Sequence, residues 1–241
     1  MTKVEAIAKV MEENGGVASL DIIYKNIIKY YPSAKKSKEW AAGIRGVLYR
    51  ELKNNRRFKK IGLSIYALSD YQEEQKPDVT NKVRMHSYIE GICIELGNLD
   101  NYFTYTADPS AIYRDHLQLR DFTTMPNIPN FSYKNIVDEA KYIDVIWFNR
   151  QGFAFPQRVF EVVDSISTLN GAFNRSLQLQ NFNTKFTIVA PERHRNKYEH
   201  VLELEIYQLQ KDRFKFVNYD EIIDFYETSV KKNGMEMKLF G

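Results

Sequence analysis

Two short apolar segments, each carrying one acidic residue, constrain the fold of this 241-residue chain most strongly. They read YIDVIWF at 142–148 and RVFEVVD at 158–164, and a short loop joins them. Segments of this length, rich in β-branched and aromatic residues, predict two neighbouring strands. The acids are Asp144 and Glu161, and an ionised carboxylate within an apolar sheet is costly unless it is paired or binds a metal.

The faces of the predicted strands indicate what these acids do. Because side chains alternate along a strand, Asp144 should share a face with Ile146, and Glu161 with Val163. Two acids on neighbouring strands can share Mg²⁺, which prefers oxygen ligands and keeps several waters. Such an ion activates water and stabilises charge on a phosphoryl oxygen, so the pair indicates a phosphodiesterase site. The alternative is that either acid lies at a strand end and meets solvent or an arginine such as Arg158.

The order of predicted elements divides the chain into two domains and a linker. Residues 1–70 read as three helices and a pair of short strands, the order of a winged helix–turn–helix. Residues 71–84 are polar and lack periodic apolar residues, so they read as a linker. Residues 85–241 alternate helices and strands around a mixed sheet flanked by helices, an α/β (α+β) pattern.

The boundaries follow hydrophobic periodicity and breaker residues. In the first domain the helices are expected at about 2–14, 19–31 and 38–54, with two strands within 56–68. In the second, we expect helices at about 85–97, 168–182, 196–211 and 220–230, and strands near 101–106, 142–148, 158–164, 185–191 and 214–219.

Charge is unevenly distributed between the two domains. The net charge is only +3, but residues 1–70 hold 14 Lys and Arg against 7 Asp and Glu, whereas the rest holds 20 against 24. A basic module joined to a slightly acidic one indicates that the first binds a polyanion, unless the asymmetry is ordinary charge scatter.

Several classes of protein are not indicated. The single cysteine excludes an internal disulfide and Cys-rich zinc sites, and it fits the reducing cytoplasm. The sequence contains no run of about 18 apolar residues, so no membrane span is expected. No Gly-rich loop ending in Lys-Ser or Lys-Thr indicates a nucleotide cofactor. The histidines show no metal-ligand spacing; they are His86, His116, His194 and His200.

The second domain carries a set of short motifs in a fixed order. They are Ile143-Asp144-Val145-Ile146-Trp147, then Phe160-Glu161-Val162, Ser165 and Ser167, and a helix with Gly171 and Arg175, preceded by MPNIPNFSY. Over roughly 85–210 this order resembles the PD-(D/E)XK nuclease superfamily, especially its restriction-endonuclease-type members. The resemblance implies that Asp144 and Glu161 hold Mg²⁺, with Mn²⁺ as an alternative, and that Glu90 is an additional acid beside the metal.

One position departs from that pattern. The superfamily's lysine, two residues after the glutamate, is Val163 here, and such a lysine would orient the attacking water and offset charge in the transition state. Three readings stay open. Lys141 or Lys185 supplies the positive charge; or Arg175, Gln178 or Gln180 on the following helix takes the electrostatic part; or the domain has lost its chemistry and only binds.

The basic module has its own resemblance. GIRGVLYREL at 43–52 and RFKKIGLSIYAL at 57–68 resemble the HARE-type winged helix, which is found fused to restriction endonucleases and in chromatin proteins and is proposed to bind DNA. A winged helix places its third helix in the major groove and its wing on the backbone. The cations expected to contact DNA are Lys35, Lys36, Lys38, Arg45, Arg50, Arg56, Arg57, Lys59 and Lys60. The alternative is a solvated face on a protein-binding winged helix.

The expected function is therefore that of a restriction-type DNA endonuclease dependent on Mg²⁺. Its catalytic residues would be Asp144, Glu161, Glu90, Lys185 and Arg175, its partner double-stranded DNA, and its state a homodimer that cuts both strands. Two rivals remain. A non-catalytic DNA-binding regulator on a degenerate nuclease fold would bind without cleaving, and a protein-interaction adaptor would show no salt-dependent DNA affinity.

Overall fold

The computed structural model describes residues 1–54, 56–74, 76–77 and 82–240, without the side chains of Lys35, Lys82, Val83 and Lys238. By its internal contacts the chain forms two compact units. The first comprises Met1–Gln75 and Glu227–Gly241, and the second comprises Lys76–Tyr226. We expected 85–241 to form one domain, but the end of the chain packs with the N-terminal unit.

The first unit contains three helices and a small antiparallel sheet. A capping box at Thr2 starts α1 (Lys3–Glu13), and Ser19 caps α2 (Leu20–Tyr30), which ends before Pro32. A 3-10 turn (Pro32–Lys36) leads into α3 (Trp40–Lys53). The strands, in sheet order, are β1 (Val17–Ser19), β3 (Ile65–Leu68) and β2 (Phe58–Lys60).

The last helix, α9 (Tyr219–Phe240), contributes its second half to this unit. Met237 packs against the apolar core formed by the three helices, and Asn233 accepts a hydrogen bond from Lys60. The sequence predicted a shorter helix here, at about 220–230, and assigned it to the second domain. Such a contact joins residues far apart in the chain, so local periodicity carries no sign of it.

The second unit is built on a mixed five-stranded sheet, which confirms the predicted α/β class. Its strands, in sheet order, are β10 (Phe214–Asn218), β9 (Lys185–Ala190), β8 (Pro156–Val162), β7 (Val145–Phe148) and β4 (Phe103–Thr106). Strands β8, β9 and β10 run parallel to one another, and β7 is antiparallel to both of its neighbours.

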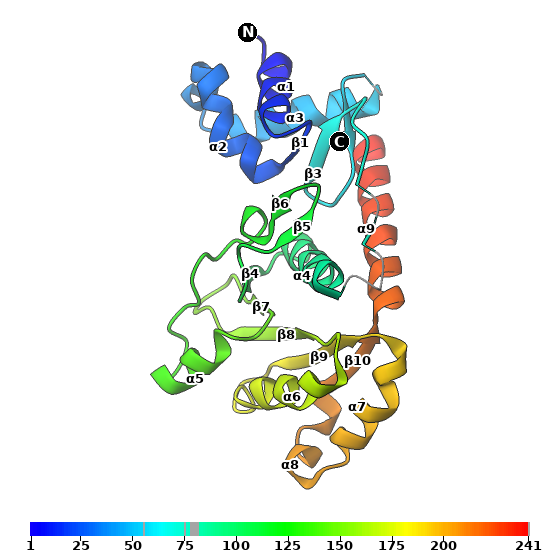
Figure 1. Cartoon of the computed structure of the whole chain (residues 1–241). Helices are drawn as coiled ribbons and strands as arrows, with labels where there is room; N and C mark the ends of the chain where they lie inside the picture. The colour runs from blue at the N-terminus through cyan, green and yellow to red at the C-terminus, as the bar shows by residue number, and fades with distance from the viewer. Residues whose placement is uncertain (55, 75, 78–81, 241) are drawn as a thin grey trace. The chain divides into compact units, whose positions relative to one another are not determined.

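Helices cover both faces of this sheet (Figure 1). On one face lies α4 (Lys82–Leu99), where the indole Nε1 of Trp147 donates a hydrogen bond to the carbonyl of Cys93 at 3.0 Å. On the other face lie α5 (Lys134–Ala140), α6 (Leu169–Leu177) and α7 (Arg195–Leu202), which share a buried cluster with Ile146, Val159 and Val163.

Some elements differ from the sequence expectation. The helix expected at 196–211 is two helices, α7 and α8 (Glu205–Gln208), and α6 ends at Leu177 rather than near 182. Helix α5 and the hairpin of β5 (Ile112–Arg114) and β6 (Leu117–Gln118) were not predicted. Among the described residues, no helix combines the length and apolar character needed to cross a membrane.

Candidate active site

The two acids of the strand motifs lie at one end of β7 and β8. Val145 pairs with Phe160 and Ile146 pairs with Val159, so continuing the register by one residue sets Asp144 opposite Glu161. Asp144 immediately precedes β7, and its Oδ2 accepts a hydrogen bond from the backbone N–H of Val162 at 2.7 Å. Asp144 therefore lies beside the end of β8 that carries Glu161, one residue outside the paired register.

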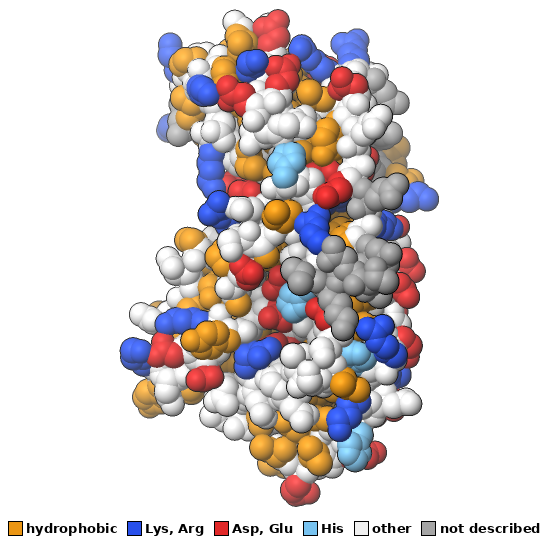
Figure 2. All heavy atoms as spheres, in the orientation of Figure 1, with side chains coloured by type: hydrophobic (Ala, Val, Ile, Leu, Met, Phe, Trp, Pro, Cys, Tyr) orange, Lys and Arg blue, Asp and Glu red, His pale blue; other side chains and the backbone are white. Residues whose placement is uncertain are grey.

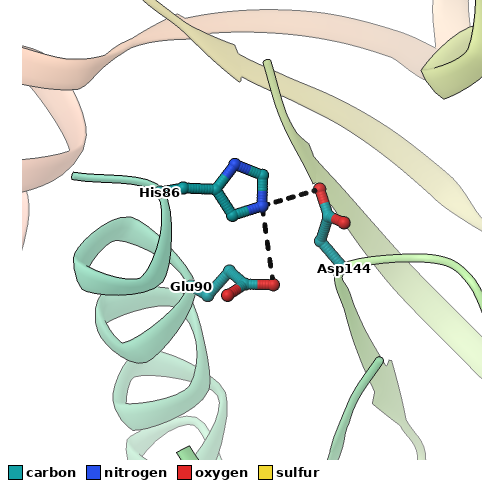
Figure 3. A group of neighbouring side chains, drawn as sticks. All are labelled: His86, Glu90 and Asp144. Atoms are coloured by element: carbon teal, nitrogen blue, oxygen red, sulfur yellow. Dashed lines mark ion pairs between the residues drawn. The ribbon is translucent and has the colours of Figure 1, made fainter. Parts of the chain in front are cut away.

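Asp144 faces two residues of α4, which are labelled in Figure 3. Nε2 of His86 lies 3.7 Å from Oδ2 of Asp144 and 3.8 Å from Oε1 of Glu90. Residues 86 and 90 are four positions apart, so one face of the helix presents both. The three side chains each offer a ligand atom, and these atoms lie within 4.8 Å of one another.

The other ring nitrogen of His86 contacts a further carboxylate, that of Asp164. Its Nδ1 lies 2.7 Å from Oδ2 of Asp164, which follows the end of β8. Oδ1 of Asp164 accepts a hydrogen bond from the hydroxyl of Tyr219 at 2.6 Å. Because a carboxylate only accepts hydrogen bonds, Nδ1 carries the hydrogen, and Nε2 is the nitrogen that faces Glu90 and Asp144.

Burial and neighbouring charges shift the pKa values of the residues in this group. Burial, and next the nearby Asp144, raise the pKa of Glu90 well above its ordinary value. Burial also raises the pKa of Asp144, against the opposing effects of His86 and of the Val162 N–H. Burial lowers the pKa of His86, but Asp164 and Asp144 outweigh it and the pKa is raised. A cation at this place would relieve the repulsion between the acids.

Glu161 has a different partner. Its side chain is fully buried and receives two hydrogen bonds from Arg175 of α6, one from Nε to Oε1 at 2.8 Å and one from Nη2 to Oε2. Burial raises the pKa of Glu161, and these bonds from Arg175 oppose the rise. Within the described residues, Glu161 is therefore outside the group formed by His86, Glu90 and Asp144.

No lysine takes the place that the resemblance left open, as far as the described residues extend. Val163 is 1% exposed and belongs to the apolar cluster under α6. Lys185 pairs with Arg158 in the sheet, three residues before the level of Glu161, so it lies about 10 Å along the strands from it. Lys141 forms an ion pair with Asp138 at 2.6 Å. Arg175 is the predicted candidate that lies beside the acids, and its charge is one of those that oppose the rise in the pKa of Asp144 caused by burial.

A cavity of about 520 Å³ opens onto the metal-ligand candidates. Glu90, Asp144, Asp164 and His86 line it on one side, and Asp108 and Arg84 lie among its other lining residues. A cavity of this size with convergent polar groups and shifted pKa values has the properties of a reactive site.

The cations predicted to contact DNA fall into two groups: some bond other side chains of the protein, and others are exposed. Arg45 donates to the hydroxyl of Tyr24 at 2.9 Å, Lys59 pairs with Glu73 at 3.4 Å, and Lys60 bonds Asn233. The side chain of Lys35 lies outside the described residues. The remaining predicted cations are exposed: Lys36, Lys38, Arg50, Arg56 and Arg57. On the face of the first unit that Figure 2 shows, acidic side chains are interspersed with basic ones.

Sequence reasoning missed His86, Asp164 and Tyr219. It set His86 aside because the four histidines show no mutual metal-ligand spacing, but the relevant partner is an acid. His86 and Glu90 stand at i and i+4 of a predicted helix, and that spacing was readable. Asp164 ends the second acidic segment, but nothing in that segment shows that it would contact His86, and Tyr219 reaches the site from a distant element, so no local pattern marked it.

The donor chemistry fits a divalent cation. Two carboxylates suit a hard ion such as Mg²⁺ or Mn²⁺, and an imidazole nitrogen suits a first-row transition ion. Glu90 is 2% exposed, and in the described part of the chain its carboxyl group faces Nε2 of His86 at 3.8 Å, so a cation bound here would stabilise its ionised form.

Residues 67–238 match the model of the family described as "Type II restriction enzyme NmeDI C-terminal domain". The match covers well over half of the chain and contains the candidate site. No curated protein and no solved structure gave a significant match.

Proposed function

The chain belongs to the type II restriction enzyme NmeDI C-terminal domain family, and on that premise we propose that it hydrolyses phosphodiester bonds of duplex DNA with the help of Mg²⁺. The single observation that carries the proposal is the convergence of the half-buried Asp144 and the buried Glu90 in a cavity of about 520 Å³. Mn²⁺ is the alternative ion.

Asp144 and Glu90 are the carboxylates that would hold the ion. Asp144 accepts a hydrogen bond from the Val162 N–H, and Glu90 projects from α4, so secondary structure orients both ligands without the metal. A divalent ion bound there supplies an activated water and stabilises charge on the phosphoryl oxygen.

Glu161 and Arg175 take a supporting part in this proposal. Glu161 fixes the guanidinium of Arg175 through two hydrogen bonds, and the side chain of Arg175 stays 30% exposed. A positive group so placed near Asp144 can offset charge that builds on a phosphate, the task expected of the superfamily's lysine. This assigns Glu161 to Arg175 rather than to the metal, and it gives Lys185 no role.

The first unit would hold the DNA. Its element order and its β1-β3-β2 sheet are those expected of a winged helix, and five exposed cations are available for phosphate contacts. Membership in the PD-(D/E)XK superfamily is part of the same proposal; the mixed sheet with acids at the β7–β8 end supports it. A homodimer would allow both strands to be cut with two-fold symmetry.

The rival is a DNA-binding protein without catalytic activity. The burial of Val163 favours it, as does the pairing of Glu161 with Arg175, because both leave the site with fewer free polar groups than a nuclease of this kind is expected to have.

Plasmid cleavage tests the proposal. Supercoiled DNA is incubated with the protein and Mg²⁺ or Mn²⁺, comparing wild type with Asp144→Asn and Glu90→Gln. We expect the wild type to nick or linearise DNA, and each variant to lose more than ~100-fold in rate because several kcal/mol of charge stabilisation disappears. DNA binding without cleavage by the wild type under both metals would favour the rival.

A further inference from the structure

His86 faces two acids of the candidate site without forming a hydrogen bond to either of them. Its Nε2 faces both Glu90 and Asp144, yet it lies 3.8 and 3.7 Å from their oxygens, beyond hydrogen-bond distance (Figure 3). Ligand atoms bound to one ion at about 2.1 Å lie about 3–4.2 Å apart, depending on the angle between them. The observed separations fall in that range.

The hydrogen bonds on the Nδ1 side of His86 resemble those made by histidines that bind metals. A metal-bound imidazole donates its other N–H to a carboxylate, which fixes the tautomer and the ring orientation. Asp164 accepts from Nδ1 at 2.7 Å, and Tyr219 in turn donates to Asp164 at 2.6 Å. Nε2 is the ring nitrogen that faces the two acids, and on losing its proton it can donate a lone pair to a metal ion.

We propose that His86 is the third protein ligand of this site, so that the site prefers a first-row transition ion over Mg²⁺ and Ca²⁺. The preference follows from the donor set, because imidazole suits transition metals, whereas Mg²⁺ and Ca²⁺ favour oxygen. Asp164 and Tyr219 are positioning residues that act through His86. The inference rests on the proposed function only in taking the site to bind a divalent ion.

The decisive readout is spectroscopic. Mn²⁺ is bound to the full chain, and electron spin echo envelope modulation detects nitrogen coupled to the ion. We expect ¹⁴N coupling in the wild type, replaced by ¹⁵N coupling when the histidines are ¹⁵N-labelled. His86→Ala and His86→Gln should lose the coupling, while His200→Ala, an exposed histidine on α7, should keep it.

Calorimetry on the same proteins tests the preference. We expect Co²⁺ to bind more tightly than Mn²⁺, and Mn²⁺ more tightly than Mg²⁺, with the differences shrinking in His86→Gln. Asp164→Asn should weaken Mn²⁺ binding about 10- to 100-fold, the cost of losing a partner behind a ligand. Tyr219→Phe should weaken it less.

The outcomes separate this inference from the nuclease proposal. Mn²⁺ binding without nitrogen coupling in the wild type overturns the histidine ligand, while plasmid cleavage would still support a nuclease that uses carboxylates alone. Nitrogen coupling without any DNA cleavage supports the ligand and removes the nuclease. Failure of the wild type to bind Mn²⁺ overturns the inference outright.

Discussion

At the scale of residues, the sequence pointed to three acids but not to the side chains that contact them. Asp144, Glu161 and Glu90 were chosen because a carboxylate in an apolar segment needs compensation. Which side chain faces each acid depends on other elements, namely Arg175 for Glu161 and His86 for the other two. Those pairings are set by packing over long sequence distances, and no local pattern contains them.

The pairing of Arg175 with Glu161 predicts a stability effect. Arg175→Met leaves the fully buried Glu161 without its cation, so we expect the free energy of unfolding to fall by about 3–5 kcal/mol. Urea denaturation followed by circular dichroism measures this. The matched control is the double variant Arg175→Met with Glu161→Gln, which removes the charge and should recover most of the loss. A single-variant loss below ~1 kcal/mol would mean that the pair is not intact in solution.

At the scale of elements, the strand motifs were predictable and the helix packing was not. The apolar segments predicted two acidic strands at 142–148 and 158–164, and the structure has β7 and β8 there, although β7 begins only after Asp144. The close approach of α4 to its neighbours depends instead on small residues. A Cβ at Gly91 would lie 2.2 Å from the ring of Tyr113, and one at Gly97 would lie 2.5 Å from Trp147.

Gly91→Ala therefore tests how α4 positions the site. Despite the better helix propensity of alanine, the clash with the buried Tyr113 should destabilise the second unit by about 1–3 kcal/mol. Because Gly91 follows Glu90, Mn²⁺ affinity should fall as well. Gly171→Ala on α6 is the control, since its Cβ would meet Arg175 at an ordinary 3.5 Å. Unchanged stability and Mn²⁺ affinity in Gly91→Ala would contradict this packing.

At the scale of the whole molecule, the two-part organisation was visible in the charge distribution, whereas the return of the chain's end to the first unit was not. The asymmetry between residues 1–70 and the rest indicated a polyanion-binding module. The structure narrows that set of cations, because Arg45, Lys59 and Lys60 bond within the protein and five others are exposed.

Salt dependence of DNA affinity tests the exposed set. Replacing Lys36, Lys38, Arg50, Arg56 and Arg57 with glutamine should weaken duplex binding and reduce the slope of log K against log salt by about 0.9 for each phosphate that the protein no longer neutralises. Fluorescence anisotropy without divalent metal measures it. Lys25→Gln with Lys29→Gln is the control, because these lysines pair with Asp21 and Glu13. An unchanged slope in the five-residue variant would place DNA elsewhere.

The most direct test of the account is a crystal structure of the protein grown with Mn²⁺, using anomalous scattering to locate the ion. The account predicts one peak about 2.0–2.3 Å from Nε2 of His86 and from carboxylate oxygens of Glu90 and Asp144, with Arg175 still on Glu161. A peak shared by Asp144 and Glu161 with Arg175 displaced, or the absence of any peak in the cavity, would contradict it.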